Sequence, residues 1–105
     1  MSNESIAVQI GQAWKSYREG RSDAAVNEFE RILKNHADDA DANYGLGLAQ
    51  QALGMKEAAA QSFKRALEVV SRVEPTSQEE RDRSMMLTRM IKQRLEELGS
   101  GAQQG

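Results

Sequence analysis

The sequence has no cysteine, a single proline and no acidic or basic tail. Without a thiol, the chain needs no oxidising compartment and offers no sulfur to a metal ion or to nucleophilic catalysis. Its formal net charge of -2 argues against a dedicated nucleic-acid or membrane surface. No stretch nears the roughly 20 apolar residues of a membrane span, and the start of the chain lacks the basic and apolar regions of a secretory signal. We therefore expect a cytoplasmic protein that binds neither nucleic acid nor membrane.

Proline, the strongest helix breaker, occurs once. The chain is rich in alanine, leucine, glutamate, glutamine, lysine and arginine, all of which favour helices. Gly20, Gly54 and Pro75 stand where the apolar periodicity is interrupted. The pattern predicts an all-α protein with helices at about 4–19, 22–36, 40–53, 56–73 and 78–98, followed by a disordered tail at 99–105.

One segment, residues 40–67, occurs in two copies. Its sequence, ADANYGLGLAQQALGMKEAAAQSFKRAL, predicts a helix, a turn at Gly54 and a second helix. The same pattern stands 34 residues earlier, the period of a known helix-turn-helix repeat. The matching pairs are Ala13 with Gly47, Gly20 with Gly54, Ala25 with Ala59, Phe29 with Phe63, and Leu33 with Leu67.

These positions resemble the tetratricopeptide repeat family, whose pattern has Leu-Gly in the first helix, Gly at the turn, Ala-x-x-x-aromatic in the second helix and then Ala-Leu. The second copy matches at Leu46-Gly47, Gly54, Ala59, Phe63 and Ala66-Leu67. The first copy keeps Gly20, Ala25, Phe29 and Leu33 but has Gln9, Gln12 and Ile32 where the family prefers Trp, Leu and Ala. The resemblance covers Ile6 to about Val73 and implies a short right-handed solenoid of about five antiparallel helices.

We expect one domain at 1–98, with repeat one at 6–39, repeat two at 40–73 and a capping helix at 78–98. A third repeat is not expected, because it would place Thr88 at the turn glycine and Glu97 at the aromatic position. Ser77 and Glu80 form a capping box at the start of the last helix. The apolar stripe that should cover the end of the second repeat comprises Leu87, Met90, Ile91, Leu95 and Leu98.

The acidic cluster Asp39-x-Asp41-x-Asn43 imitates the opening of a calcium-binding loop. Such a loop needs glycine at its sixth position and a bidentate glutamate at its twelfth. Tyr44 and Gln50 stand there, so the calcium interpretation fails and capping of a helix explains the acidic residues. We expect no metal and no cofactor.

His36 is the only histidine, and no second imidazole or thiol is available to make it a ligand or a general base. The chain also lacks a phosphate-binding glycine loop and any context for a catalytic triad, because Gly45 and Gly47 lie within a predicted helix. We therefore do not expect an enzyme.

The first helices of tetratricopeptide repeats line a concave groove. The resemblance places Ile10, Trp14, Tyr17, Tyr44, Leu48 and Gln51 on that groove, as an apolar row with aromatic edges. An alternative is that the first helix is rotated, so that Ile10, Trp14 and Tyr17 belong to the core. Tyr44 and Leu48 are expected to be exposed, because Leu46, Gly47 and Leu53 already give their helix a separate packing face.

Some family members clamp the carboxylate of a chaperone peptide with Lys and Asn side chains in the groove. Ile10, Trp14 and Gly45 occupy those positions, so an apolar ligand segment fits better. We expect an adaptor that binds a helix or extended peptide of another protein. The alternative is a homo-oligomeric module that uses the groove for self-association, and we expect a monomer or weak homodimer. Met85 has no obvious place in a monomer, because it shares a side with Arg89, Lys92 and Glu96.

Overall fold

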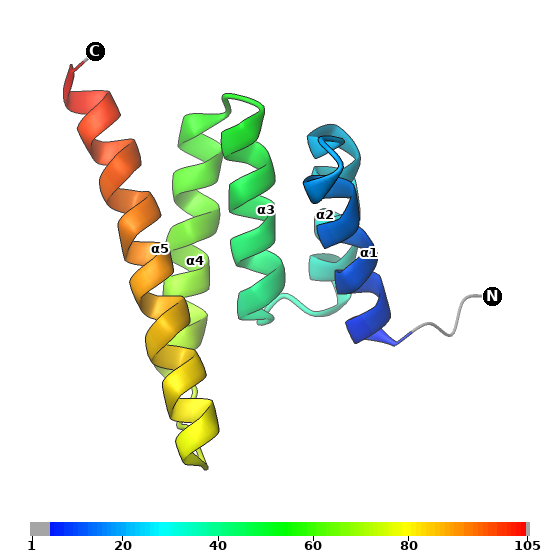
Figure 1. The fold of residues 1–105 in the computed structure, drawn as a ribbon, viewed down its shortest axis with the longest axis vertical. Helices are drawn as coiled ribbons and strands as arrows, with labels where there is room; N and C mark the ends of the chain where they lie inside the picture. The colour runs from blue at the N-terminus through cyan, green and yellow to red at the C-terminus, as the bar shows by residue number, and fades with distance from the viewer. Residues whose placement is uncertain (1–4, 105) are drawn as a thin grey trace.

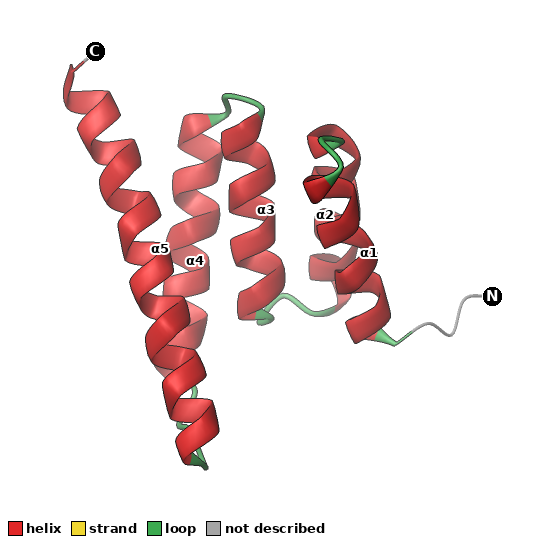
Figure 2. Cartoon of the chain, viewed as in Figure 1, coloured by secondary structure: helices red, strands yellow, loops and turns green. Residues whose placement is uncertain are grey.

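A computed structural model describes residues 5–104, those from 100 onward by their backbone alone. It contains five helices: α1 (Ile6–Arg18), α2 (Ser22–Asn35), α3 (Ala40–Ala52), α4 (Lys56–Arg72) and α5 (Gln78–Gln104). They follow one another across the molecule, with α1 at one end and α5 at the other (Figure 1). The described residues contain no strand (Figure 2), which confirms the all-α prediction.

The predicted end of the last helix is wrong. α5 continues to Gln104, because Gly99 lies inside the helix with an ordinary backbone conformation and does not terminate it. Of the predicted disordered tail at 99–105, residue 105 lies outside the described residues. The division into repeats at 6–39 and 40–73 and a capping helix stays a prediction.

The two turns of the repeats are built alike. Gly20 and Gly54 adopt positive φ angles of 83° and 78°, which side chains other than glycine rarely tolerate. The amide of Gly20 donates to the carbonyl of Tyr17 at 3.1 Å, and that of Gly54 donates to the carbonyl of Gln51 at 3.0 Å. Because equivalent residues make equivalent bonds, each pair of helices closes in the same way.

Two glycines allow α3 to sit between its neighbours. A Cβ atom on Gly47 would stand 2.5 Å from Cε1 and 2.7 Å from Cδ1 of Phe63, a residue of α4. A Cβ atom on Gly45 would stand closer than 3.0 Å to three atoms of the Phe29 ring in α2. The first contact confirms the predicted packing of Gly47 near Phe63, and the second was not predicted. Every residue from 42 to 50 is buried in consequence.

The core has two clusters. The first joins α1, α2 and α3 around Ala13, Phe29 and Leu46. The second joins α3, α4 and α5 around Phe63 and Ile91. Trp14 and Tyr17 pack against both clusters, so repeat one and repeat two share a single continuous core.

α5 packs on α4 through an apolar stripe. Ile91 and Leu98 are buried, and Leu87 and Leu95 are partly buried against the second cluster. Met90 was expected in this stripe but is 39% exposed, because it lies about 100° around the helix from Ile91.

The start of α5 is capped as predicted by Ser77. The Ser77 hydroxyl accepts from the amide of Glu80 at 3.1 Å. The Glu80 carboxylate accepts from the amide and the hydroxyl of Thr76, both at 2.9 Å, which holds the pKa of Glu80 below its usual value. Thr76 and Ser77, the two residues before α5, therefore fix the start of the helix through hydrogen bonds to Glu80.

Candidate functional site

The predicted groove residues come from two helices that lie in contact. α1 carries Trp14 and Tyr17, whose rings meet edge-on with centroids 5.9 Å apart. The Tyr44 ring of α3 lies 6.3 Å from the ring of Trp14. The structure thus brings these three aromatic residues together, as the family resemblance implied.

Tyr44 and Leu48 are not exposed, contrary to expectation. Their exposed fractions are 4% and 7%. Tyr44 packs against Phe63, with ring centroids 5.7 Å apart, and both residues belong to the cluster that includes Ile91 and Leu98 of α5. The expectation fails because α3 uses more than one face for packing.

The residues that remain accessible form a smaller surface. Ile10, Trp14, Tyr17 and Gln51 are each partly exposed, and we call these four residues the accessible row. Trp14 also packs against Phe29, with ring centroids 5.3 Å apart. The α1 residues therefore fit both interpretations, as core residues and as residues of an open surface. One side of each residue packs in the core and the other side is exposed to solvent.

Asp41 borders the accessible row. Its Oδ2 accepts a hydrogen bond from Nε1 of Trp14 at 3.3 Å, which ties α3 to α1. Partial desolvation raises the pKa of Asp41 above its usual value, the Trp14 hydrogen bond lowers it, and the nearby Asp39 raises it. The sequence indicated Asp41 only as part of a capping cluster, because nothing in the sequence shows a contact between residues 27 positions apart.

Asp39 is the cap of α3, and its Oδ1 accepts from the amide of Ala42 at 2.8 Å. Capping therefore accounts for this member of the acidic cluster. Within residues 5–104, no three His, Cys, Asp or Glu side chains are grouped to hold a metal ion.

A hydrogen bond between the two helices of a repeat recurs at equivalent positions, part-buried in repeat one and buried in repeat two. The Ser16 hydroxyl donates to Oε1 of Glu28 at 2.9 Å in repeat one. At the equivalent positions of repeat two, the Ser62 hydroxyl donates to Oε1 of Gln50 at 2.6 Å. Sequence comparison missed this feature because the serine lies on the first helix in one copy and on the second helix in the other.

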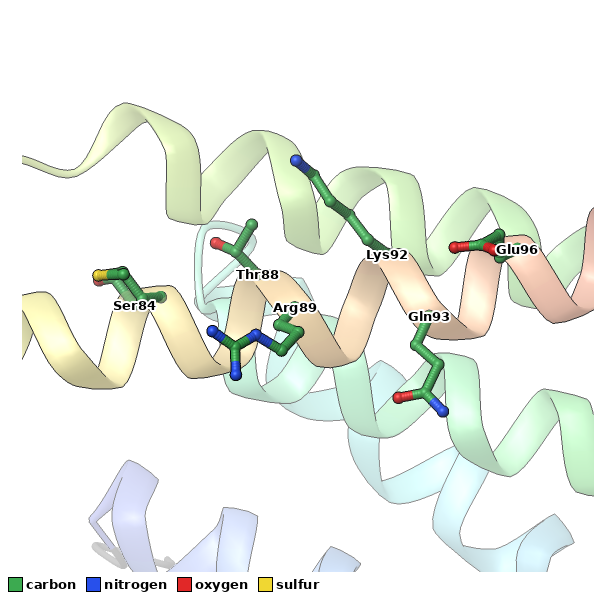
Figure 3. A pocket seen from close by; sticks show the side chains of 7 residues that line it. Ser84, Thr88, Arg89, Lys92, Gln93 and Glu96 are labelled. Carbon is green, nitrogen blue, oxygen red and sulfur yellow. The ribbon is translucent and has the colours of Figure 1, made fainter.

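A separate hollow lies on α5. It has a volume of about 530 Å³ and is lined by Ser84, Met85, Thr88, Arg89, Lys92, Gln93 and Glu96 (Figure 3). Met85 is 58% exposed there, beside Arg89, Lys92 and Glu96, as its helical position predicted.

No helix in the described part of the chain is both long and apolar enough to cross a membrane.

Comparison with known proteins identifies the repeats. A family model described as tetratricopeptide repeat matches residues 10–72, which is more than half of the chain and runs from within α1 to the end of α4. No curated protein and no solved structure matches the chain. With the repeated turns and the glycine contacts of α3, this match shows that the chain belongs to the tetratricopeptide repeat family.

Proposed function

We propose that the protein is a non-enzymatic adaptor that binds an apolar peptide segment or helix of another protein on the accessible row. Tetratricopeptide repeat domains are generally protein interaction modules. The observation that supports this site is that Ile10, Trp14 and Tyr17 of α1 and Gln51 of α3 are each partly exposed, on two helices that contact each other. Aromatic residues of this kind are the commonest anchors of protein interfaces.

The chemistry of the accessible row favours an apolar ligand. Its α1 residues are aliphatic or aromatic, and Gly45 provides no side chain at the position where some family members place an asparagine. Phe29 fills the space beside Gly45, so a ligand carboxylate finds no polar partner at that point. Asp41 is the acidic neighbour of Trp14, which favours a basic residue next to the apolar segment.

A displayed peptide library selected on the purified protein tests this site. Trp14 is the only tryptophan, so its emission should shift to the blue when a selected peptide covers it. Tyr17→Ala and Gln51→Ala should each weaken peptide binding, by about 1–2 kcal/mol for the aromatic side chain. Glu30→Ala, an exposed position on α2, is the matched control and should leave affinity unchanged. Peptides that bind all four proteins equally, with unchanged Trp14 emission, would show that the accessible row is not the site.

A further inference from the structure

The solvent-facing side of α5 has the spacing of a helix-pairing surface. We define the outer face of α5 as Gln78, Asp82, Met85, Arg89, Lys92 and Glu96, which follow one another at alternating steps of four and three residues. These steps are those of any one face of a helix and also of the positions that meet in a coiled coil. Only Met85 of the six is apolar, so the face offers polar and charged groups arranged around one methionine. All six lie about 100° to 180° around the helix from the buried Ile91.

The fold explains why this face is open. α3 packs between α2 and α4, with Gly45 against Phe29 on one side and Gly47 against Phe63 on the other. α5 packs on α4, but no helix among the described residues covers its opposite side. Met85 therefore lies 58% exposed in the hollow on that side.

We propose that two copies of the chain pair through this face, with the two α5 helices antiparallel about a two-fold axis. Such a contact is isologous, so the same residues serve both copies and the assembly closes as a dimer. The site differs from the accessible row, which lies on α1 and α3.

The charges of the outer face support the antiparallel arrangement. When Met85 lies opposite the partner's Arg89, Asp82 lies opposite the partner's Lys92 and Gln78 lies opposite the partner's Glu96. No two like charges then meet, and the two-fold axis makes the Asp82 pairing occur twice. The aliphatic stem of Arg89 is long enough to cover a methionine while its guanidinium stays in water.

Among the described residues, most of these groups have no charged partner. Arg89, Lys92 and Glu96 form no ion pair with any residue of the described part. Asp82 accepts a hydrogen bond from the neutral Nε2 of Gln78 at 2.9 Å and forms no ion pair with another described residue. The Asp82 pairing with the partner's Lys92 therefore breaks no ion pair of the monomer.

Pairing of two helices buries less area than a standard interface of about 1,600 Å², so we expect a weak dimer. Sedimentation equilibrium of the full chain should show a mass that rises from monomer to dimer as the concentration increases. Met85→Asp should prevent this rise. Arg83→Asp, at an exposed position about 140° around the helix from the middle of the outer face, should not. A monomer at every concentration up to about 1 mM, or a dimer that survives Met85→Asp, would overturn the proposal.

A charge exchange tests the register. Asp82→Lys should weaken the dimer about 3- to 10-fold, because it places like charges opposite each other twice. Lys92→Asp should do the same. The double variant Asp82→Lys with Lys92→Asp should recover most of the lost affinity. Additive losses in the double variant would overturn the antiparallel pairing of these positions.

Cysteine cross-linking tests orientation, since the chain has no cysteine of its own. An Asp82→Cys chain mixed with a Lys92→Cys chain should oxidise mainly to the mixed disulfide, well above the half expected from random collision. In this mixed dimer, Lys92 of the Asp82→Cys chain still faces Asp82 of the Lys92→Cys chain, so one of the two ion pairs is kept. A parallel arrangement would instead join 82 to 82 and 92 to 92, and that result, or cross-linking at the random ratio, would overturn the proposal. Peptide binding by the accessible row is independent of each of these outcomes.

Discussion

The ring of Phe29 lies directly against the backbone of Gly45, where even a methyl group would overlap it. Gly47 stands in the same relation to Phe63. The phenylalanine of each repeat thus meets one of two glycines in the same helix, two residues apart. The separation of α2, α3 and α4 is set at these two points, because a larger residue at either one must displace an aromatic ring.

We expect Gly45→Ala and Gly47→Ala each to lower the free energy of unfolding by about 1–3 kcal/mol through overpacking. The matched control is Gly11→Ala in α1, where nothing lies within 4 Å of the added Cβ. This change should instead stabilise the protein by about 0.5–1 kcal/mol, because alanine loses less backbone entropy in a helix. Urea unfolding followed by circular dichroism measures all three. Equal effects at positions 11, 45 and 47 would contradict the packing described.

The aromatic residues should separate into structural and accessible ones. Tyr44→Ala removes a buried ring that contacts Trp14 and Phe63, so we expect it to lower the free energy of unfolding by about 3–5 kcal/mol. Tyr17→Ala removes a partly exposed ring and should cost less. Thermal unfolding of the two variants tests this order, and a Tyr44→Ala protein as stable as wild type would place Tyr44 on the surface.

Ser62→Ala leaves the buried oxygen of Gln50 without its donor, so we expect a loss of about 1–3 kcal/mol in the free energy of unfolding. Ser71→Ala is the matched control, because the hydroxyl of Ser71 bonds the carbonyl of Leu67 at an exposed site. That change should alter stability by only about 0.5 kcal/mol or less. Chemical denaturation measures the free energy of unfolding of both variants. The difference between them should disappear if a water molecule replaces the Ser62 hydroxyl as the donor to the Gln50 oxygen.

Asp41 gives stability a specific dependence on pH. Because its pKa is raised in the folded protein, the native state favours the protonated carboxyl group. Its contribution to stability is therefore complete below its ordinary pKa and is lost as the pH rises through the raised value. We expect Asp41→Asn, which stays neutral and still accepts from Trp14, to gain stability relative to wild type as the pH rises from about 3 through the raised pKa of Asp41. The gain should be modest, because Asp41 is exposed.

Trp14→Phe is the complementary variant. It removes the hydrogen bond that lowers the pKa of Asp41, so the loss of stability with rising pH should become larger than in wild type. Denaturant unfolding at several pH values compares the three proteins. Parallel curves for Asp41→Asn and wild type would contradict the assigned shift.

Local patterns predicted the fold well, because glycine turns and apolar periodicity act over a few residues. α1 to α4 begin and end within two residues of the predicted bounds. The state of Tyr44 and Leu48 could not be predicted, since it depends on how α4 and α5 pack around α3. The hydrogen bond between Trp14 and Asp41 could not be predicted for the same reason. It joins two helices through residues 27 positions apart, and apolar periodicity gives no information on contacts between helices.

The placement of Trp14 also determines how the protein emits light. Both tyrosines of the chain lie beside the one tryptophan, with ring centroids 5.9 Å away for Tyr17 and 6.3 Å away for Tyr44. At such separations, energy absorbed by either tyrosine passes to the indole before it is emitted. The folded protein should therefore show almost no tyrosine fluorescence. Separation of α1 from α3 should restore the emission of Tyr44 alone, because Tyr17 shares α1 with Trp14 and stays beside it. Tyrosine emission therefore reports on the junction of the two repeats.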